Sequence, residues 1–221
     1  MYYTARCVAL SSNNREKRVL LKRGKGLRPL LALVILLASS ALLAETKITG
    51  LQINSLSNPV FSPSRKGGGT SDAWAAVELD YELGGSKETW TDNVEIRWLV
   101  VVPSSGQKKY ACMSRILKYR DIELGQQHHA MVLINPRFFR RHAAGHHLDT
   151  NTMSAYVEVY VDGKLIAKKD RRANGMPKGD WWMKTDRMQR FEGTLLPRFK
   201  TPFSVLDTLY YDAEIENEKG K

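Results

Sequence analysis

Apolar and polar residues alternate in several short segments after the first 45 residues of the chain. Residues 73–82 (AWAAVELDYE) and 93–102 (NVEIRWLVVV) carry apolar side chains at every second position, with charged residues between them. An alternation with a period of two predicts a half-buried strand that turns its apolar side toward a core. Shorter segments of the same kind predict further strands at 47–54, 108–119, 129–134, 155–161 and 164–169.

The segments are joined by residues that favour turns. Asp162-Gly163 separates two predicted strands by two residues that tolerate a positive φ, which predicts a β-hairpin with a type I′ turn. Residues 55–71 are rich in Ser, Pro and Gly and predict an exposed loop. Beyond residue 44, no segment keeps a helical period over three turns, so we expect this part to be mostly β.

About seven short strands without strand–helix alternation favour an all-β fold, an immunoglobulin-like antiparallel β-sandwich. Trp98 stands in the middle of a predicted strand, where the third strand of such a sandwich places its central tryptophan. The cysteine pair that usually packs against that tryptophan is absent from the sequence. A jelly roll or another antiparallel sandwich therefore remains an alternative.

The last forty or so residues contain prolines at 197 and 202, which interrupt regular strands. We expect an extended segment that wraps the sandwich, with Phe203, Leu206 and Leu209 docked on it. Adjacent Trp181 and Trp182 would lie on opposite sides of an extended chain, one in the core and the other exposed or covered by a loop. The acidic end, residues 213–221, is predicted to be disordered.

Residues 1–44 have the layout of a secretory signal peptide. Basic residues precede an apolar run at 30–44, which ends in small residues and is shorter than a permanent membrane span. Cleavage is expected after Ala44, or else after Ala41, and an uncleaved signal anchor is the alternative. Because the segment before the apolar run is long, we expect translation to begin near Val19.

The net charge of the chain is +11, from 34 Lys and Arg against 23 Asp and Glu. Residues 1–44 hold eight of the basic residues and one acid, which leaves 26 basic and 22 acidic residues, or +4, in residues 45–221. The predicted domains are thus a signal peptide (1–44), a sandwich (45–212) and a tail (213–221). The basicity lies mostly in the signal peptide, so we do not expect a nucleic-acid partner.

Residue types that support catalysis do not form a recognisable motif. Cleavage after Ala44 would leave Cys112 alone, and a lone cysteine on a strand is more often a buried apolar residue than a nucleophile. The carboxylates that alternate with apolar residues are predicted to form a solvated face; they are Glu78, Asp80, Glu82 and Glu95. We therefore predict no catalytic residues, no cofactor and no enzymatic activity.

All five histidines fall between residues 128 and 147. The spacing of His142, His146 and His147, with Asp149 nearby, makes them candidate metal ligands. Gly145 disfavours a helix there, and zinc sites need three or four convergent ligands, so solvated loop histidines are the favoured interpretation and no metal is predicted.

Two groups of residues are candidates for binding. Basic residues cluster around Phe138-Phe139 and again after the hairpin; they are Arg137, Arg140 and Arg141, then Lys168, Lys169, Arg171 and Arg172. Tryptophans are candidate platforms for stacking on sugar rings; they are Trp90, Trp181 and Trp182. The plainer alternative for both groups is a solvated turn with the aromatic rings in the core.

Several segments together resemble a known family; they are VELDYE, NVEIRWLVVVP, MVLINPRFFRR, YVEVYVDGKLIA, the WW pair and LLPRFKTPF. They are similar to exported immunoglobulin-fold proteins of verrucomicrobia that are encoded with a type IV pilus-like gene cluster. The resemblance covers most of residues 45–212 and implies a pilus- or envelope-associated role, a fold like the globular domain of archaeal-type pilins, and no catalytic residues.

The sequence departs from that of a true pilin. A prepilin is cut before its apolar segment, whereas here the small-residue site follows that segment. We therefore expect a soluble companion of a pilus, exported to the periplasm, the outer envelope or the cell exterior. Its expected partners are envelope or pilus-like proteins, or other copies of the chain, and it would touch the membrane only through an uncleaved leader. The alternatives are a secreted carbohydrate-binding module and a metal-dependent hydrolase.

Overall fold

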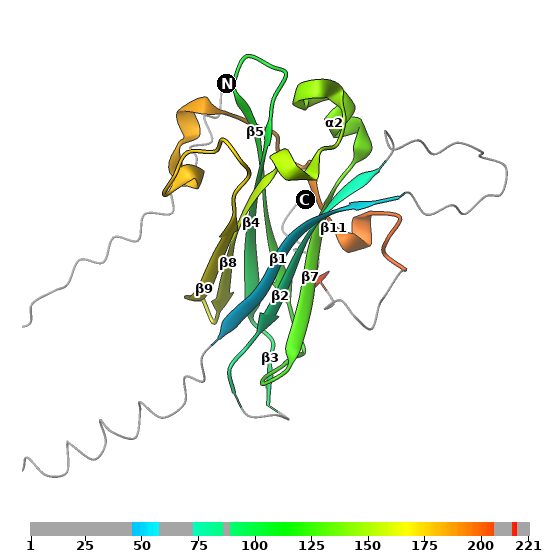
Figure 1. Ribbon diagram of the computed structural model, residues 1–221. Coiled ribbons are helices and arrows are strands. Elements are labelled where there is room, and N and C mark those ends of the chain that lie inside the picture. The colour runs from blue at the N-terminus through cyan, green and yellow to red at the C-terminus, as the bar shows by residue number, and fades with distance from the viewer. Residues whose placement is uncertain (1–45, 58–72, 86–88, 206–213, 216–221) are drawn as a thin grey trace, which may run out of the picture. The chain divides into compact units, whose positions relative to one another are not determined.

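The structure is a computed structural model that describes residues 46–57, 73–85, 89–205 and 214–215 (Figure 1). The predicted signal peptide, most of the 55–71 loop, Leu206 and Leu209 lie outside these residues. The strands are β1 (Lys47–Leu56), β2 (Trp74–Glu82), β3 (Trp90–Thr91), β4 (Val94–Pro103), β5 (Tyr110–Tyr119), β6 (Ile122–Glu123), β7 (Gln127–Ile134), β8 (Ser154–Val161), β9 (Lys164–Arg171), β10 (Met188–Arg190), β11 (Leu195–Pro197) and β12 (Glu214–Ile215). One helix, α2 (Pro136–His142), accompanies them in this part of the chain, where no helix is long and apolar enough to cross a membrane.

The strands form two large sheets that face each other across one core, and β3 and β6 form a separate two-stranded sheet. The first has the order β1-β2-β7-β11, and the second has the order β10-β5-β4-β8-β9, with β12 also paired to β5. The pairs within both sheets are antiparallel except β10, which runs parallel to β5. The predicted all-β sandwich is confirmed. Its strands β1-β2-β7 and β5-β4-β8-β9 follow the order A, B, E and C′, C, F, G of immunoglobulin-like sandwiches, while β10, β11 and β12 are additional.

The core lies where the alternation of apolar residues predicts it. In β4, Val94, Ile96, Trp98 and Val100 are buried, while Glu95 and Arg97 between them are partly exposed. Trp98 is 2% exposed and pairs with Val157 on β8 in the middle of its sheet. Buried side chains of β2 and β7 in the other sheet belong with Trp98 to one continuous core.

The predicted hairpin joins β8 to β9. Asp162 and Gly163 have φ values of 49° and 75°, as a type I′ turn requires. Asp162 is further held because its side chain accepts a hydrogen bond from Asn93 at 3.1 Å. Local chemistry alone was therefore enough to locate this turn.

The part of the chain after residue 44 is mostly β, as expected, and α2 is shorter than the three turns over which a helical period was sought. Asn135 caps this helix, since its side-chain oxygen accepts a hydrogen bond from the backbone N–H of Arg137 at 2.8 Å, and Pro136 occupies the first turn. Pro136, Phe138 and Phe139 are buried. With seven residues, the helix is too short to show the periodicity on which the prediction depended; the Asn-Pro pair was the available signal.

The segment after β9 covers part of the outer face of the second sheet. Trp181 and Trp182 lie in a 3-10 turn (Trp181–Met183) rather than in an extended chain, so their rings meet edge to face with centroids 5.6 Å apart. Trp181 is fully buried and Trp182 partly exposed. Phe203 docks edge-on against Trp74 at 5.7 Å, as expected. Of the tail predicted to be disordered, Glu214–Ile215 form β12 on β5.

Candidate functional site

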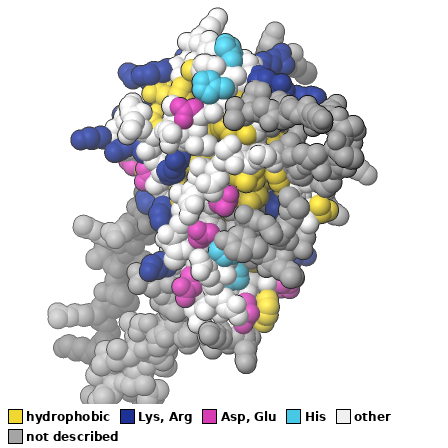
Figure 2. Space-filling model, turned by 45° about the vertical axis from the view of Figure 1, so that its right-hand side comes forward, with side chains coloured by type: hydrophobic (Ala, Val, Ile, Leu, Met, Phe, Trp, Pro, Cys, Tyr) yellow, Lys and Arg dark blue, Asp and Glu magenta, His cyan; other side chains and the backbone are white. Residues whose placement is uncertain are grey.

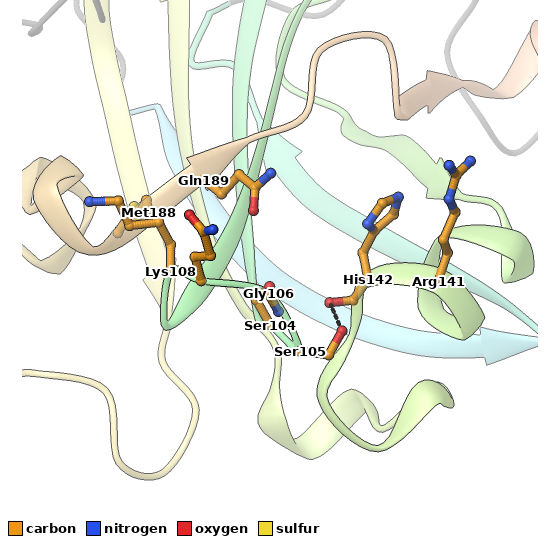
Figure 3. A pocket seen from close by; sticks show the side chains of 9 residues that line it. Ser104, Ser105, Gly106, Lys108, Arg141, His142, Met188 and Gln189 are labelled. Carbon is orange, nitrogen blue, oxygen red and sulfur yellow. Dashed lines mark hydrogen bonds between the residues drawn. The ribbon is translucent and has the colours of Figure 1, made fainter.

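A polar pocket of about 590 Å³ lies at the end of the sandwich that carries α2. Three separate parts of the chain form it: the loop between β4 and β5, the last residues of α2, and β10. In Figure 3, Arg141 and His142 stand on one side, Met188 and Gln189 on the other, and Ser104–Gly106 between them. Residues more than 80 positions apart in the sequence thus face one space.

The β4–β5 loop is fastened to α2 by its backbone. The N–H of Ser104 donates to the carbonyl of Lys109 at 3.0 Å and closes the loop, while the N–H of Ser105 donates to the carbonyl of His142, also at 3.0 Å. Ser104 and Ala143 form an isolated antiparallel bridge. Because these bonds join the loop to the residues at the helix end, two walls of the pocket form one unit.

The third wall is β10, which pairs with the first residues of β5. Gln189 lies opposite Ala111, and the strand is continued by a hydrogen bond from the N–H of Phe191 to the carbonyl of Cys112 at 2.9 Å. Gly106 allows a close approach here: a Cβ at this position would lie 3.2 Å from Oε1 of Gln189. The pairing therefore fixes the backbone of Gln189 at the edge of the pocket.

The groups that line the pocket are two carboxamides (Gln107 and Gln189), two hydroxyls (Ser104 and Ser105), an imidazole and two basic side chains. Ser105 Oγ donates to the carbonyl of His142 at 3.3 Å. Nζ of Lys108 donates to the carbonyl of Asp186 at 2.7 Å, and its side chain runs away from His142 (Figure 3). Arg141 is therefore the cation that faces the pocket from α2.

His142 is held between aromatic rings. Its centroid lies 4.5 Å from that of Phe191 and 5.3 Å from that of Phe138. Burial, and then the charge of Arg141, lower the pKa of His142 below its ordinary value of 6.5. At neutral pH the ring is therefore uncharged and acts in the pocket as a neutral hydrogen-bonding group.

The surroundings of the pocket are basic. At the end of the molecule that carries α2, the space-filling view shows Lys and Arg side chains together with His side chains (Figure 2). Arg137, Arg140 and Arg141, the first predicted basic cluster, are exposed on α2, while Phe138 and Phe139 between them are in the core. Only Arg141 of the three lines the pocket.

The predicted histidine cluster is divided by the fold. His146 and His147 are exposed beyond α2, and each bonds a backbone carbonyl through Nδ1: His146 that of Arg140 at 3.0 Å, His147 that of Gly145 at 2.8 Å. His128 and His129 lie on β7. Within the described ranges, no three His, Cys, Asp or Glu residues gather as a metal site would require.

The carboxylates predicted to be solvated are instead partly buried, and three of them bond other side chains in the sheets. Asp80 Oδ1 lies 2.7 Å from Nδ1 of His129, and Glu95 accepts from Nε of Arg97 at 2.7 Å. Glu78 accepts from Asn54 at 3.0 Å. Asp80 and Glu78 find their partners on neighbouring strands, and Glu95 finds its partner two positions along β4, on the same face of the strand.

Sequence reasoning missed Glu158, which is buried on β8 at 5% exposure. Tyr156 and Tyr160 each donate a hydroxyl hydrogen bond to it, at 2.9 and 2.8 Å, and the Arg97 guanidinium lies 4.1 Å from the Tyr160 ring centroid. The signal was present in YVEVYV, where a tyrosine stands two positions before and after the glutamate, on the same side of the strand.

The predicted binding tryptophans, the second basic cluster and Cys112 differ in how far their side chains reach solvent. Trp90 is 58% exposed on β3, Trp181 offers no free ring face, and Trp182 stacks on Tyr156 with centroids 4.2 Å apart. The second basic cluster is on and after β9, where Nζ of Lys169 donates to the carbonyl of Thr49 at 3.2 Å. Cys112 is buried on β5, which confirms the prediction, and burial raises the pKa of its thiol to about 11.

Comparison with known proteins agrees with the fold. A protein-family model matches residues 39–219, which is most of the chain. The chain belongs to this family. A crystal structure of a protein from Akkermansia muciniphila is similar, with a TM-score of 0.64 and 18% sequence identity, over 78% of this chain and 94% of the other. At that identity the likeness shows a common fold. No curated protein matches the sequence.

Proposed function

We propose that this protein is a non-enzymatic component of the cell envelope that works through protein–protein contacts in a type IV pilus-like system. One observation carries the proposal. The strand segments resemble exported verrucomicrobial proteins encoded with a pilus-like gene cluster, and the similar crystal structure also comes from a verrucomicrobe. A pilin-like immunoglobulin domain is the finer form of the same proposal, supported by the strand order of the two sheets.

Export is supported by the first 44 residues, in which basic, apolar and small residues follow one another as in a secretory signal. The proposed location is the periplasm, the outer envelope or the cell exterior. Its proposed partners are envelope or pilus-like proteins, or other copies of the chain.

A non-enzymatic role is supported by the chemistry of the pocket. Ser105 donates its hydroxyl proton to a backbone carbonyl rather than to a base, and His142 lies against Phe191. A catalytic serine instead needs its hydroxyl hydrogen-bonded to a base that a third group orients. The groups in the pocket are better suited to binding than to proton transfer.

Fractionation of the native organism with mass spectrometry tests this proposal. We expect the protein in the envelope or extracellular fraction, with a mature N-terminus at Glu45, and cross-linked to pilus-like components. Recovery in the cytosol with intact peptides across residues 40–50 and without such components would refute it.

A carbohydrate-binding module is a second candidate because Trp90 exposes 58% of its surface. An exposed indole can stack on a sugar ring. This candidate predicts glycan-array signals that the Trp90→Ala substitution removes, whereas an array without signals would reject it.

A further inference from the structure

Two basic side chains line the pocket at the end of α2: Nζ of Lys108 is hydrogen-bonded to a backbone carbonyl, and Arg141 is the cation on the opposite wall. The Arg141 side chain is exposed, and its guanidinium has no ion-pair partner among the residues that the structure describes. The nine residues that line the pocket include no Asp or Glu. A guanidinium in this setting favours a carboxylate or another planar anion, which it can bind through two parallel hydrogen bonds.

The other groups indicate what should accompany that anion. Gln107 and Gln189 each present a donor and an acceptor, which is also what each peptide unit of a backbone offers. An exposed aromatic ring would favour a sugar, and the one ring in this lining, His142, is already packed against Phe138 and Phe191. The lining therefore favours a peptide over a sugar.

We infer that this pocket binds an acidic, extended peptide segment of a partner protein, with Arg141 on a carboxylate and the carboxamides of Gln107 and Gln189 on the peptide backbone. The inference rests on the proposed function, since it names the site through which one protein contact is made. The backbone of the walls is already fixed by the bonds from Ser105 to His142 and by the pairing of β10 with β5. Binding therefore costs little backbone conformational entropy.

The chain itself supplies a suitable probe. Residues 212–218 read DAEIENE, with an acid at every second position, so that an extended peptide of this sequence carries its four carboxylates on one side. A synthetic peptide with this sequence is the test ligand. The control peptide NAQIQNQ has the same length and no carboxylate side chains.

The experiment is a fluorescence anisotropy titration of the labelled peptides with the full chain at low and high salt. We expect the acidic peptide to bind, the control peptide not to bind, and binding to weaken with salt as ion pairing requires. The Arg141→Gln substitution should weaken binding about tenfold, as expected for loss of a charged hydrogen-bonded pair. The Arg137→Gln substitution removes the same charge one turn earlier on α2, outside the pocket, and should change affinity less than about twofold.

A second variant tests the pocket without changing its charge. The Gly106→Ala substitution places a methyl group 3.2 Å from Oε1 of Gln189, so the carboxamide must move and binding should weaken while the melting temperature is kept. Equal binding of both peptides, equal effects of the two arginine substitutions, or no binding would overturn the inference. Competition by a glucuronate oligosaccharide but not by unlabelled acidic peptide would assign the site to glycans instead.

The experiments distinguish failure of the envelope role from failure of the peptide-binding pocket. If the peptide does not bind but the protein is found in the envelope with pilus-like components, only the pocket assignment is lost. If the peptide binds but the protein stays in the cytosol, the envelope role is lost.

Discussion

Individual residues of one type occupy very different environments in this protein, and the tryptophans are the clearest case. Trp181 is fully buried beside Tyr110 and Cys112, and its Nε1 donates to Asp170 at 3.3 Å. Trp90 is mostly in solvent. The sequence alone offered both as candidate binding platforms, since composition does not reveal which ring a later segment covers.

This difference in burial predicts a large loss of stability when the Trp181 side chain is truncated and a small one when that of Trp90 is. Trp181→Ala should lower the free energy of unfolding by about 3–5 kcal/mol, because it empties a large core volume and leaves the Asp170 carboxylate without its indole donor. Trp90→Ala, the matched control, should change it by less than about 0.5 kcal/mol. Urea denaturation measures both, and similar losses in the two variants would contradict the burial of Trp181.

Tyr160 gives a prediction for pH. Burial, and then its hydrogen bond to Glu158, raise the pKa of Tyr160 from 10.0 to about 12. The unfolded chain therefore loses this proton at a lower pH than the folded chain, so the stability contribution is complete below pH 10 and is lost as pH rises from 10 toward 12. Urea denaturation at pH 8 and pH 11 should show a larger loss for the native chain than for Tyr160→Phe. Equal losses would show that Tyr160 ionises alike in both states.

Among the elements, α2 depends on local capping and on two buried rings. Asn135→Ala removes the side-chain acceptor of the Arg137 N–H and should lower the free energy of unfolding by about 1 kcal/mol. Asn135→Asp keeps a side-chain acceptor and should retain most of the stabilisation that the cap provides.

Denaturation of both variants and of Asn151→Ala checks this. Asn151 is exposed in a 3-10 turn (Thr150–Thr152), and the structure shows no hydrogen bond from its side chain. A loss for Asn151→Ala as large as that for Asn135→Ala would mean that capping is not the cause.

The longer strands could be predicted from the sequence because each carries its own pattern. β2, β4 and β8 alternate over eight or more residues, and the Asp162-Gly163 turn encodes a hairpin. β10 and β11 have three residues each, which is too short for any period to show. Their positions come from pairing with β5 and β7, so only the folded chain defines them.

At the scale of the whole molecule, the segment after β9 covers the thiol of Cys112 on the outer face of the second sheet. Cys112 lies on β5 between β4 and β10, and burial raises the pKa of its thiol to about 11, so little reactive thiolate is present at pH 8. In a Cys7→Ser variant, we expect Ellman's reagent to label Cys112 slowly, at a rate set by opening of the fold, and rapidly in urea.

The rate should therefore rise with the concentration of urea well below the unfolding midpoint. Immediate labelling in native buffer would show that the segment covering Cys112 does not protect it. The same measurement on Gly106→Ala would show whether that substitution disturbs this side of the sheet.

The pocket could not be predicted from the sequence, although its single residues could be. Arg141 and His142 were both candidates, one in a basic cluster and the other among metal ligands. Gln189 completes the pocket from the opposite side, where the pairing of β10 with β5 places it. No local pattern relates positions separated by this much chain.

The position of β10 late in the chain also determines when the pocket can form. Met188 and Gln189 supply one wall of the pocket, and all nine strands from β1 to β9 precede them in the chain. A growing or translocating chain thus lacks the complete pocket until most of its length is available to fold. The pocket is therefore completed after the main strands of the sandwich, so that folding of those strands would precede the first contact with a partner.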